Sequence, residues 1–123
     1  MKKSVINKTI DFLQKGAVLL CPTDTIWGLG CDPNNEDAVN RIIALKQRDW
    51  TKGLIVLVNE LPEPIDRALS SEQRQKIDNT WPGPVTWLVN NSDFYAPWIT
   101  GGSSRVALRI SAHPLVTQLV KAV

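Results

Sequence analysis

The amino-acid sequence predicts a single domain of the layered α/β class, and three observations carry that prediction. Its 123 residues are close to the commonest domain length and are too few for two cores. Segments with the apolar spacing of amphipathic helices alternate along the chain with short, continuous apolar runs typical of buried strands. No internal repeat, low-complexity tract or linker interrupts this alternation.

The N-terminal elements are predicted from apolar spacing and from the residues that break it. Residues 3–15 show the pattern of an amphipathic helix, which Gly16 ends. Residues 17–21 form an apolar run closed by Pro22, the pattern of a strand covered on both faces. Residues 22–33 mix polar, glycine and apolar side chains, and we expect a loop that packs against the domain.

Two helices and one strand are predicted in the middle of the chain. Asn35 is suited to cap a helix with an acidic first turn and an apolar face, which we expect to end near Arg48. Residues 54–58 are continuously apolar and predict a second buried strand. A capping-box pattern that begins at Ser70 opens a further helix running to about Thr80.

The C-terminal part predicts two strands and a last helix. Residues 82–84, Pro-Gly-Pro, force a turn before a strand over residues 85–89, and residues 90–104 are predicted to form a loop. In residues 106–110 the large apolar side chains fall at every second position, so Arg109 points to the opposite face of this strand. A helix with an apolar face follows.

Composition and missing motifs exclude several classes of function. The formal net charge of +2 is too small for a protein held to polyanions by bulk charge. No run approaches the roughly 20 apolar residues of a membrane span, and two cysteines with one histidine cannot form a usual zinc site. The Walker loop, the dinucleotide fingerprint and the serine nucleophile elbow are also absent. We expect a cytoplasmic protein with no membrane contact and no metal-ligating residues.

Four cations, Arg41, Lys46, Arg48 and Lys52, lie around the end of the helix that Asn35 begins. One interpretation is a solvated helix end whose charges complement the helix dipole. The alternative is a triphosphate site, because Lys46 and Arg48 straddle the helix exit, where the backbone changes direction. Both interpretations stay open from the residues alone.

A second polar cluster, Thr23, Asp24 and Thr25, follows the first predicted strand. Open α/β sheets bind ligands beyond the carboxyl ends of their strands, although a turn that satisfies its own backbone explains the same residues. Arg109 needs an anionic partner if it is covered. Either Asp24 or the carboxylate of a substrate could supply it.

Four separated motifs resemble, in the correct order, those of the YrdC-like domain family. They stand at residues 22–32 (Pro-Thr-Asp-Thr-Ile-Trp-Gly-Leu-Gly-Cys-Asp), at 45–48 and 52–55 (Leu-Lys-Gln-Arg and Lys-Gly-Leu-Ile), at 81–86 (Trp-Pro-Gly-Pro-Val-Thr), and at 106–110 and 113–115 (Val-Ala-Leu-Arg-Ile and His-Pro-Leu). The resemblance spans nearly the whole chain. It implies a twisted, mostly open mixed sheet flanked by helices.

The resemblance also implies an activity. Members of this family make threonylcarbamoyl-adenylate from L-threonine, bicarbonate and ATP, releasing pyrophosphate, and Mg²⁺ is expected to bridge the phosphates. The product serves tRNA-modification proteins that act downstream on tRNAs reading ANN codons. Many members are described as binding double-stranded RNA on a positive concave surface. We therefore expect these small molecules, the downstream proteins and double-stranded RNA or tRNA as partners.

Matching positions carry the expected threonine site. By resemblance, Thr25 contacts L-threonine and Thr23 shapes the same pocket. Arg109 is expected to meet the threonine carboxylate.

The expected ATP site consists of cations. By resemblance, Lys46 and Arg48 bind the phosphates and are the expected catalytic residues, with Lys52 as a further phosphate ligand. Arg105 stands at an ATP-contacting position where the family usually has a small or hydroxylated residue.

The family continues past the His-Pro-Leu helix into a further strand and a Ser-x-Asn motif that contributes to ATP and threonine binding, whereas this sequence ends at Val123. We therefore expect a C-terminally shortened domain that lacks part of the family's pocket. Two other functions stay open. One is a non-catalytic module that binds double-stranded RNA or a nucleotide, and the other is a structural protein that forms a homodimer through an exposed strand edge.

Overall fold

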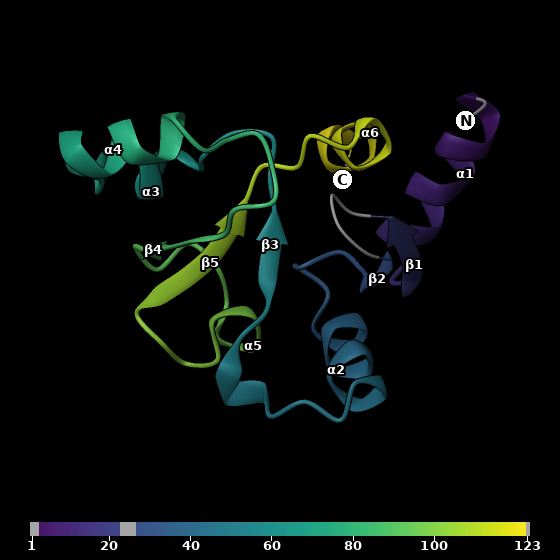
Figure 1. Cartoon of the computed structure of the whole chain (residues 1–123). Coiled ribbons are helices and arrows are strands. Elements are labelled where there is room, and N and C mark those ends of the chain that lie inside the picture. Colours follow the sequence, from purple (N-terminus) through teal and green to yellow (C-terminus); the bar gives the residue numbers. More distant parts are fainter. Residues whose placement is uncertain (1–2, 23–26, 123) are drawn as a thin grey trace.

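A computed structural model describes residues 3–22 and 27–122, and it has the mixed α/β architecture that the sequence predicts (Figure 1). The strands form two sheets. One is an antiparallel hairpin of β1 (Leu19–Pro22) and β2 (Trp27–Gly30). The other is a three-stranded sheet in the order β3 (Ile55–Leu57), β5 (Arg105–Arg109) and β4 (Trp87–Asn90).

The three-stranded sheet is mixed, which confirms the predicted sheet type. β5 is the central strand, parallel to β3 and antiparallel to β4. The register places Leu57 opposite Arg109, so the C-terminal ends of the two parallel strands lie side by side. Val106 and Leu108 are fully buried on one face of β5, as their alternate spacing predicts.

Helices cover this sheet, and short polar sequences set their ends. They are α2 (Glu36–Leu45), the 3₁₀ turn η1 (Trp50–Lys52), α3 (Glu63–Arg67), α4 (Ser71–Asp78) and α5 (Pro97–Thr100). The Asn35 side chain accepts a hydrogen bond from the backbone N–H of Ala38, which confirms the predicted cap. The capping box of Ser70 and Gln73 is also formed.

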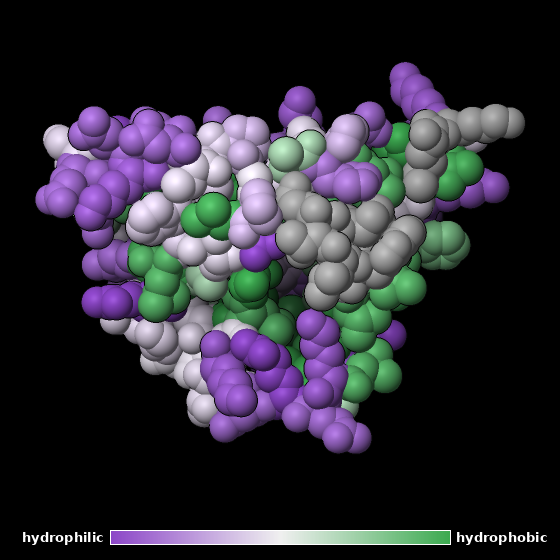
Figure 2. Space-filling model, in the orientation of Figure 1, coloured by the Kyte–Doolittle hydropathy of each residue, from purple (hydrophilic) through white to green (hydrophobic). Residues whose placement is uncertain are grey.

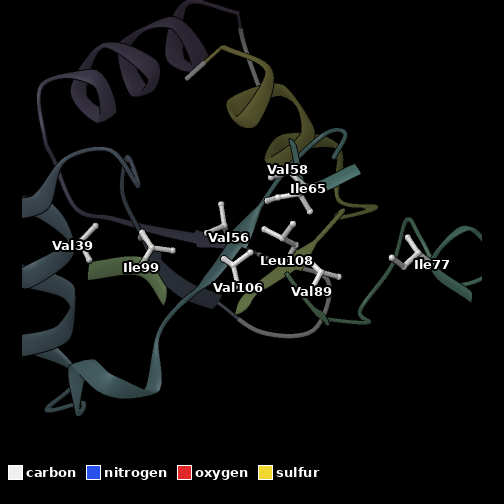
Figure 3. Packing of buried hydrophobic residues seen from close by; sticks show 9 residues of the cluster. All are labelled: Val39, Val56, Val58, Ile65, Ile77, Val89, Ile99, Val106 and Leu108. Carbon is white, nitrogen blue, oxygen red and sulfur yellow. The ribbon is translucent and has the colours of Figure 1, made fainter. Parts of the chain in front are cut away.

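The buried residues of the main hydrophobic core lie in these elements or directly beside them, within residues 36–109, which we call the sheet lobe. Its buried members are Val39, Val56, Val58, Ile65, Ile77, Val89, Ile99, Val106 and Leu108 (Figure 3). Val56, Val106 and Leu108 lie at its centre, where β3 and β5 pack against the covering helices. Burial of these side chains is the chief favourable term in the stability of the lobe.

The remaining elements form what we call the hairpin lobe: α1 (Lys3–Gln14), the β1–β2 hairpin and α6 (Pro114–Ala122). α6 packs against both α1 and β1, and Figure 1 shows these elements together on the right. Its buried side chains are Leu13, Val116 and Leu119. Hydrogen bonds from Arg41 Nη2 to the Gly16 carbonyl (3.1 Å) and from Trp98 Nε1 to the Pro33 carbonyl (2.9 Å) tie the two lobes together.

The structure corrects several predicted elements. The strand expected at residues 17–21 to be covered on both faces is β1, and its Leu20 is 65% exposed because β2 and α6, which both contact this strand, leave that side chain uncovered. The strand expected at residues 54–58 is shorter, and Ile55 is 52% exposed on it. The expected loops at residues 22–33 and 90–104 contain β2 and α5, and α3 follows the break after β3.

The middle helix ends earlier than predicted, at Leu45 instead of near Arg48. Gln47 adopts the left-handed conformation (φ 51°), and the N–H groups of Gln47 and Arg48 bond back to the carbonyls of Ala44 and Ile43. This pair of bonds is a Schellman-type end, formed here by a residue other than glycine.

Among the described helices, none combines the length and the apolar character that crossing a bilayer requires.

Candidate functional site

A groove of about 1240 Å³ separates the two lobes. Gly28, Leu29 and Gly30 of β2 line it from the hairpin lobe, and the whole of β3 lines it from the sheet lobe. Figure 2 shows apolar side chains in this hollow, with hydrophilic side chains below them over the region of η1 and the end of α2. The groove therefore has an apolar floor and a polar, cationic margin.

Lys46 and Arg48 line this groove, and the end of α2 places them there. Lys46 is the C-cap residue, and the turn at Gln47 redirects the chain before Arg48. Both side chains are exposed. Arg48 Nε donates to the Gly53 carbonyl (3.1 Å), so its position is fixed through one edge of the guanidinium while the other nitrogens stay available.

Gly53 makes this turn possible. It has φ 69°, and a Cβ atom at this position would lie 3.0 Å from the Ile99 carbonyl oxygen, closer than ordinary contact. The next residue, Leu54, donates its N–H to that same carbonyl (2.9 Å). The turn that holds Arg48 is therefore anchored directly on α5 and, through it, on the core of the sheet lobe.

Arg109 lines the same groove as Lys46 and Arg48. It is the last residue of β5 and is half-buried, on the opposite face from Leu108, as predicted. Its Nε and Nη2 atoms both donate to the hydroxyl oxygen of Thr86, at 3.0 and 2.8 Å. Within the described part of the chain, no carboxylate forms an ion pair with Lys46, Arg48 or Arg109.

The other predicted cations lie elsewhere. Lys52 is exposed at the end of η1 and does not line the groove. Arg105, the first residue of β5, lines a separate hollow of about 460 Å³ together with Leu88, Asn90 and Gln73. Lys46, Arg48 and Arg109 are thus brought together at one groove, whereas Lys52 and Arg105 are not among its lining residues.

The predicted threonine contacts Thr23 and Thr25, and the possible anionic partner Asp24, lie outside the described residues, between β1 and β2. Their roles stay predictions.

Sequence reasoning gave no role to two residues that now belong to the site. Thr86 stands in the Trp-Pro-Gly-Pro-Val-Thr motif and holds Arg109, but only the three-dimensional pairing of β4 with β5 reveals this contact. Cys31 lines the groove directly after β2. Burial, and then the neighbouring Asp32 carboxylate, raise the pKa of its thiol to about 11, while Arg41 acts in the opposite direction.

Residues that could build a metal site are sparse. In the ranges that the structure describes, no group of three His, Cys, Asp or Glu side chains lies close enough together to hold a metal ion. Glu60, Glu63 and Asp66 line the groove, but Glu63 is paired with Arg67 and Asp66 with Arg74. This donor set does not fit a protein-built Mg²⁺ site. It is compatible with Mg²⁺ that arrives bound to phosphate and water oxygens.

The arrangement suits a ligand with two anionic ends. Two exposed cations on one wall can bind phosphate oxygens, and the half-buried Arg109 can bind a carboxylate. The apolar surface between them can cover the uncharged middle of such a ligand. Chemistry at this site would depend on positioning two reactants and on neutralising charge.

The model of the Sua5/YciO/YrdC family, described as "Telomere recombination", matches residues 11–123. Among curated proteins, the chain is 48% identical over 120 residues to a threonylcarbamoyl-AMP synthase of Hahella chejuensis. That match covers 95% of this chain and 65% of the relative. A threonylcarbamoyl-AMP synthase of Yersinia enterocolitica is 42% identical, with 95% of this chain and 64% of the relative covered. The chain thus spans less than two thirds of the length of these relatives.

Solved structures have the same fold. Sua5 of P. abyssi in complex with L-threonine matches with a TM-score of 0.89 at 29% identity, over 99% of this chain and 36% of that one. E. coli YciO matches with a TM-score of 0.86 at 19% identity, over 98% of this chain and 60% of that one, which is a likeness of fold alone.

Proposed function

The chain belongs to the Sua5/YciO/YrdC family, and from this membership and the groove between its lobes we propose that it is a threonylcarbamoyl-AMP synthase. The observation that carries the proposal is one groove lined by Lys46, Arg48 and Arg109, cations that form no ion pair with a described carboxylate. The 48% identity to a protein of that name supports it, as does the L-threonine complex of P. abyssi Sua5.

The proposed reaction has two steps. The amino group of L-threonine and bicarbonate form a carbamate, with loss of water. An oxygen of the carbamate then attacks the α-phosphorus of ATP, and the bond to the β-phosphate oxygen breaks to release pyrophosphate. The attacking atom is already an anion, so no strong general base is needed, and the protein acts mainly by alignment and charge neutralisation.

Each groove cation has a distinct proposed task. Lys46 and Arg48 bind the phosphates of ATP, Lys46 as a mobile point charge and Arg48 through the nitrogens that Gly53 leaves available. Arg109, beside Leu57 at the end of β3, binds the carboxylate of L-threonine. Thr23 and Thr25 complete the threonine pocket, Lys52 and Arg105 are further ATP contacts, and Mg²⁺ accompanies ATP; these assignments rest on the family resemblance.

The decisive experiment is an assay for pyrophosphate release with ATP, Mg²⁺, bicarbonate and L-threonine. We expect release that requires both L-threonine and bicarbonate. Replacement of Lys46 or Arg48 by Ala removes a charged hydrogen bond to phosphate and should lower the rate roughly tenfold or more. Lys76→Ala is the matched control, because Lys76 is an exposed cation on α4 that pairs with Glu72 and does not line the groove. Release that is independent of L-threonine, or equal in all variants, contradicts the proposal.

The remaining partners are proposed on the family resemblance: tRNA-modification proteins that consume the product, double-stranded RNA or tRNA, and a second copy of the chain, in the cytoplasm. RNA binding through phosphate contacts should weaken steeply as salt rises. Light scattering at high protein concentration distinguishes a homodimer from a monomer.

A further inference from the structure

We propose that Thr86 is a positioning residue: its hydroxyl orients the guanidinium of Arg109 so that the groove selects amino-acid ligands with a free carboxylate. This inference rests on the proposed function, because it takes the α-carboxylate of an amino acid as the anion that Arg109 binds. Thr86 itself does not line the groove, so it acts through Arg109.

The hydrogen bonds between the two side chains use one particular edge of the guanidinium. Thr86 Oγ1 accepts from Nε at 3.0 Å and from Nη2 at 2.8 Å. An arginine has five N–H donors, and the Nε and Nη2 edge accounts for two of them. The three left are the second N–H of Nη2 and both of Nη1, which include the end-on fork that matches the two oxygens of a carboxylate.

This fork is available at the groove. Arg109 lines the groove at the end of β5, beside Leu57 at the end of β3. The side chain is half-buried, and no acidic residue of the described ranges forms an ion pair with it. A guanidinium that is partly withdrawn from water without a counter-charge favours the binding of an anion.

Thr86 can orient Arg109 because the loop before it is held at several points. The N–H of Gly83 donates to the carbonyl of Ile110 (2.9 Å), directly after Arg109. Trp81 Nε1 donates to the Val85 carbonyl (2.6 Å) inside the same loop.

A second indole fixes the far end of the loop. Trp87 Nε1 donates to the Thr80 hydroxyl (2.7 Å), so hydrogen bonds brace both sides of residues 81–86. β4 then begins at Trp87 and pairs with β5, with Trp87 opposite Leu108. The hydroxyl oxygen of Thr86 is therefore a fixed acceptor, and a fixed acceptor restricts the rotation of the long arginine side chain.

The test compares Thr86→Val with Thr86→Ser in the full chain. Valine has the shape of threonine without its hydroxyl, and serine keeps the hydroxyl. Calorimetric titrations measure the affinity of each variant for L-threonine, for L-threoninamide, which lacks the carboxylate, and for ATP. We expect wild type and Thr86→Ser to bind L-threonine with much higher affinity than L-threoninamide. In Thr86→Val, L-threonine binding should weaken roughly tenfold, the cost of a lost hydrogen bond to a charged group, with ATP binding unchanged.

The loss of discrimination between L-threonine and its amide is the result that a merely structural role would not produce. Equal preference for the carboxylate in Thr86→Val and wild type overturns the inference. Parallel losses for L-threonine, L-threoninamide and ATP indicate general misfolding in the valine variant and also overturn it, provided that Thr86→Ser retains wild-type binding.

A wild-type chain that binds no L-threonine overturns the proposed function, and a second measurement then decides the role of Thr86 separately. In ¹⁵N-resolved NMR spectra, the Nε–H of Arg109 should give a distinct signal that exchanges slowly with water in wild type and in Thr86→Ser. The same signal should exchange faster in Thr86→Val. Identical exchange in all three proteins shows that Thr86 does not restrain the guanidinium.

Discussion

The sheet lobe and the hairpin lobe differ in how completely their apolar side chains are enclosed. In the sheet lobe, Leu108 and Ile65 are fully buried among neighbours from strands and helices. In the hairpin lobe, Leu13 and Leu119 are nearly buried, yet both also line the groove, and Leu20 is 65% exposed. Both lobes border the groove, but the sheet lobe keeps part of its core, including Leu108 and Ile65, away from it, whereas Leu13, Val116 and Leu119 of the hairpin lobe all line it.

The two lobes should differ most in the stability that is lost when a buried leucine is shortened to alanine. Leu108→Ala should lower the free energy of unfolding by about 3–5 kcal/mol, because the surrounding core cannot collapse onto the cavity. Leu119→Ala, the matched change in the hairpin lobe, should cost about 1–3 kcal/mol, since one side of Leu119 already faces the groove. Urea unfolding of both variants measures the difference, and equal losses would contradict the distinction between the lobes.

The next effect concerns backbone packing inside the sheet lobe. Gly101 has φ 70°, and a Cβ atom there would lie 2.4 Å from the carbonyl oxygen of Thr51. Gly101→Ala should therefore destabilise the protein by about 2–4 kcal/mol, from strain and displacement of η1. Its neighbour Gly102 has a similar φ of 81°, but its nearest contact would be the Trp50 ring at 3.8 Å.

Gly102→Ala is thus a matched control that carries conformational strain without the clash, and about 1 kcal/mol is expected. Thermal unfolding of the two variants separates the contributions. A Gly101→Ala protein as stable as Gly102→Ala would show that η1 can move away at little cost.

The smallest effect is the dependence of reactivity and stability on pH that the Cys31 thiol causes, between the two lobes. Because the pKa of the Cys31 thiol is raised to about 11, the thiol should stay protonated and react slowly with iodoacetamide at pH 8. Folding favours the protonated thiol. The contribution of Cys31 to the free energy of unfolding is therefore fully present below pH 9 and is lost as the pH rises through about 11.

Mass mapping of the alkylated Cys31 peptide measures the rate, with the urea-unfolded chain as the reference. Alkylation should be slower in the folded chain and slower still when the groove is occupied, because Cys31 lines it. Equal rates in the folded and unfolded chains would show that the thiol is not sheltered.

The two lobes also mark how far the sequence predicts the structure. In the sheet lobe, helix caps such as Asn35 and Ser70 and the alternation along β5 are local signals, and the structure confirms them. The pattern of residues 17–21 suggested a strand covered on both faces, but coverage depends on tertiary neighbours that an apolar run does not specify. β2 escaped prediction because its glycines and polar flanks resemble a loop.

The same limit applies to the site. The sequence predicts Lys46, Arg48 and Arg109 as binding residues, and the structure brings all three to one groove. It also predicts Arg105 as a binding residue. Arg105 and Arg109, however, stand at opposite ends of the five-residue strand β5, and Arg105 lines a different hollow. Local spacing and the family resemblance mark these cations as candidates, while the direction of β5 decides which of them line the same groove.

Both groove arginines are held by the protein through Nε, Arg48 by the Gly53 carbonyl and Arg109 by the Thr86 hydroxyl. Lysine carries the same charge but only a single terminal nitrogen, so it cannot keep an internal anchor while presenting a planar pair of donors outward. Exchange of arginine for lysine in related sequences should therefore be rare at positions 48 and 109. The reverse exchange, arginine in place of lysine, should be far better tolerated at position 52, where Lys52 has no such anchor among the described contacts.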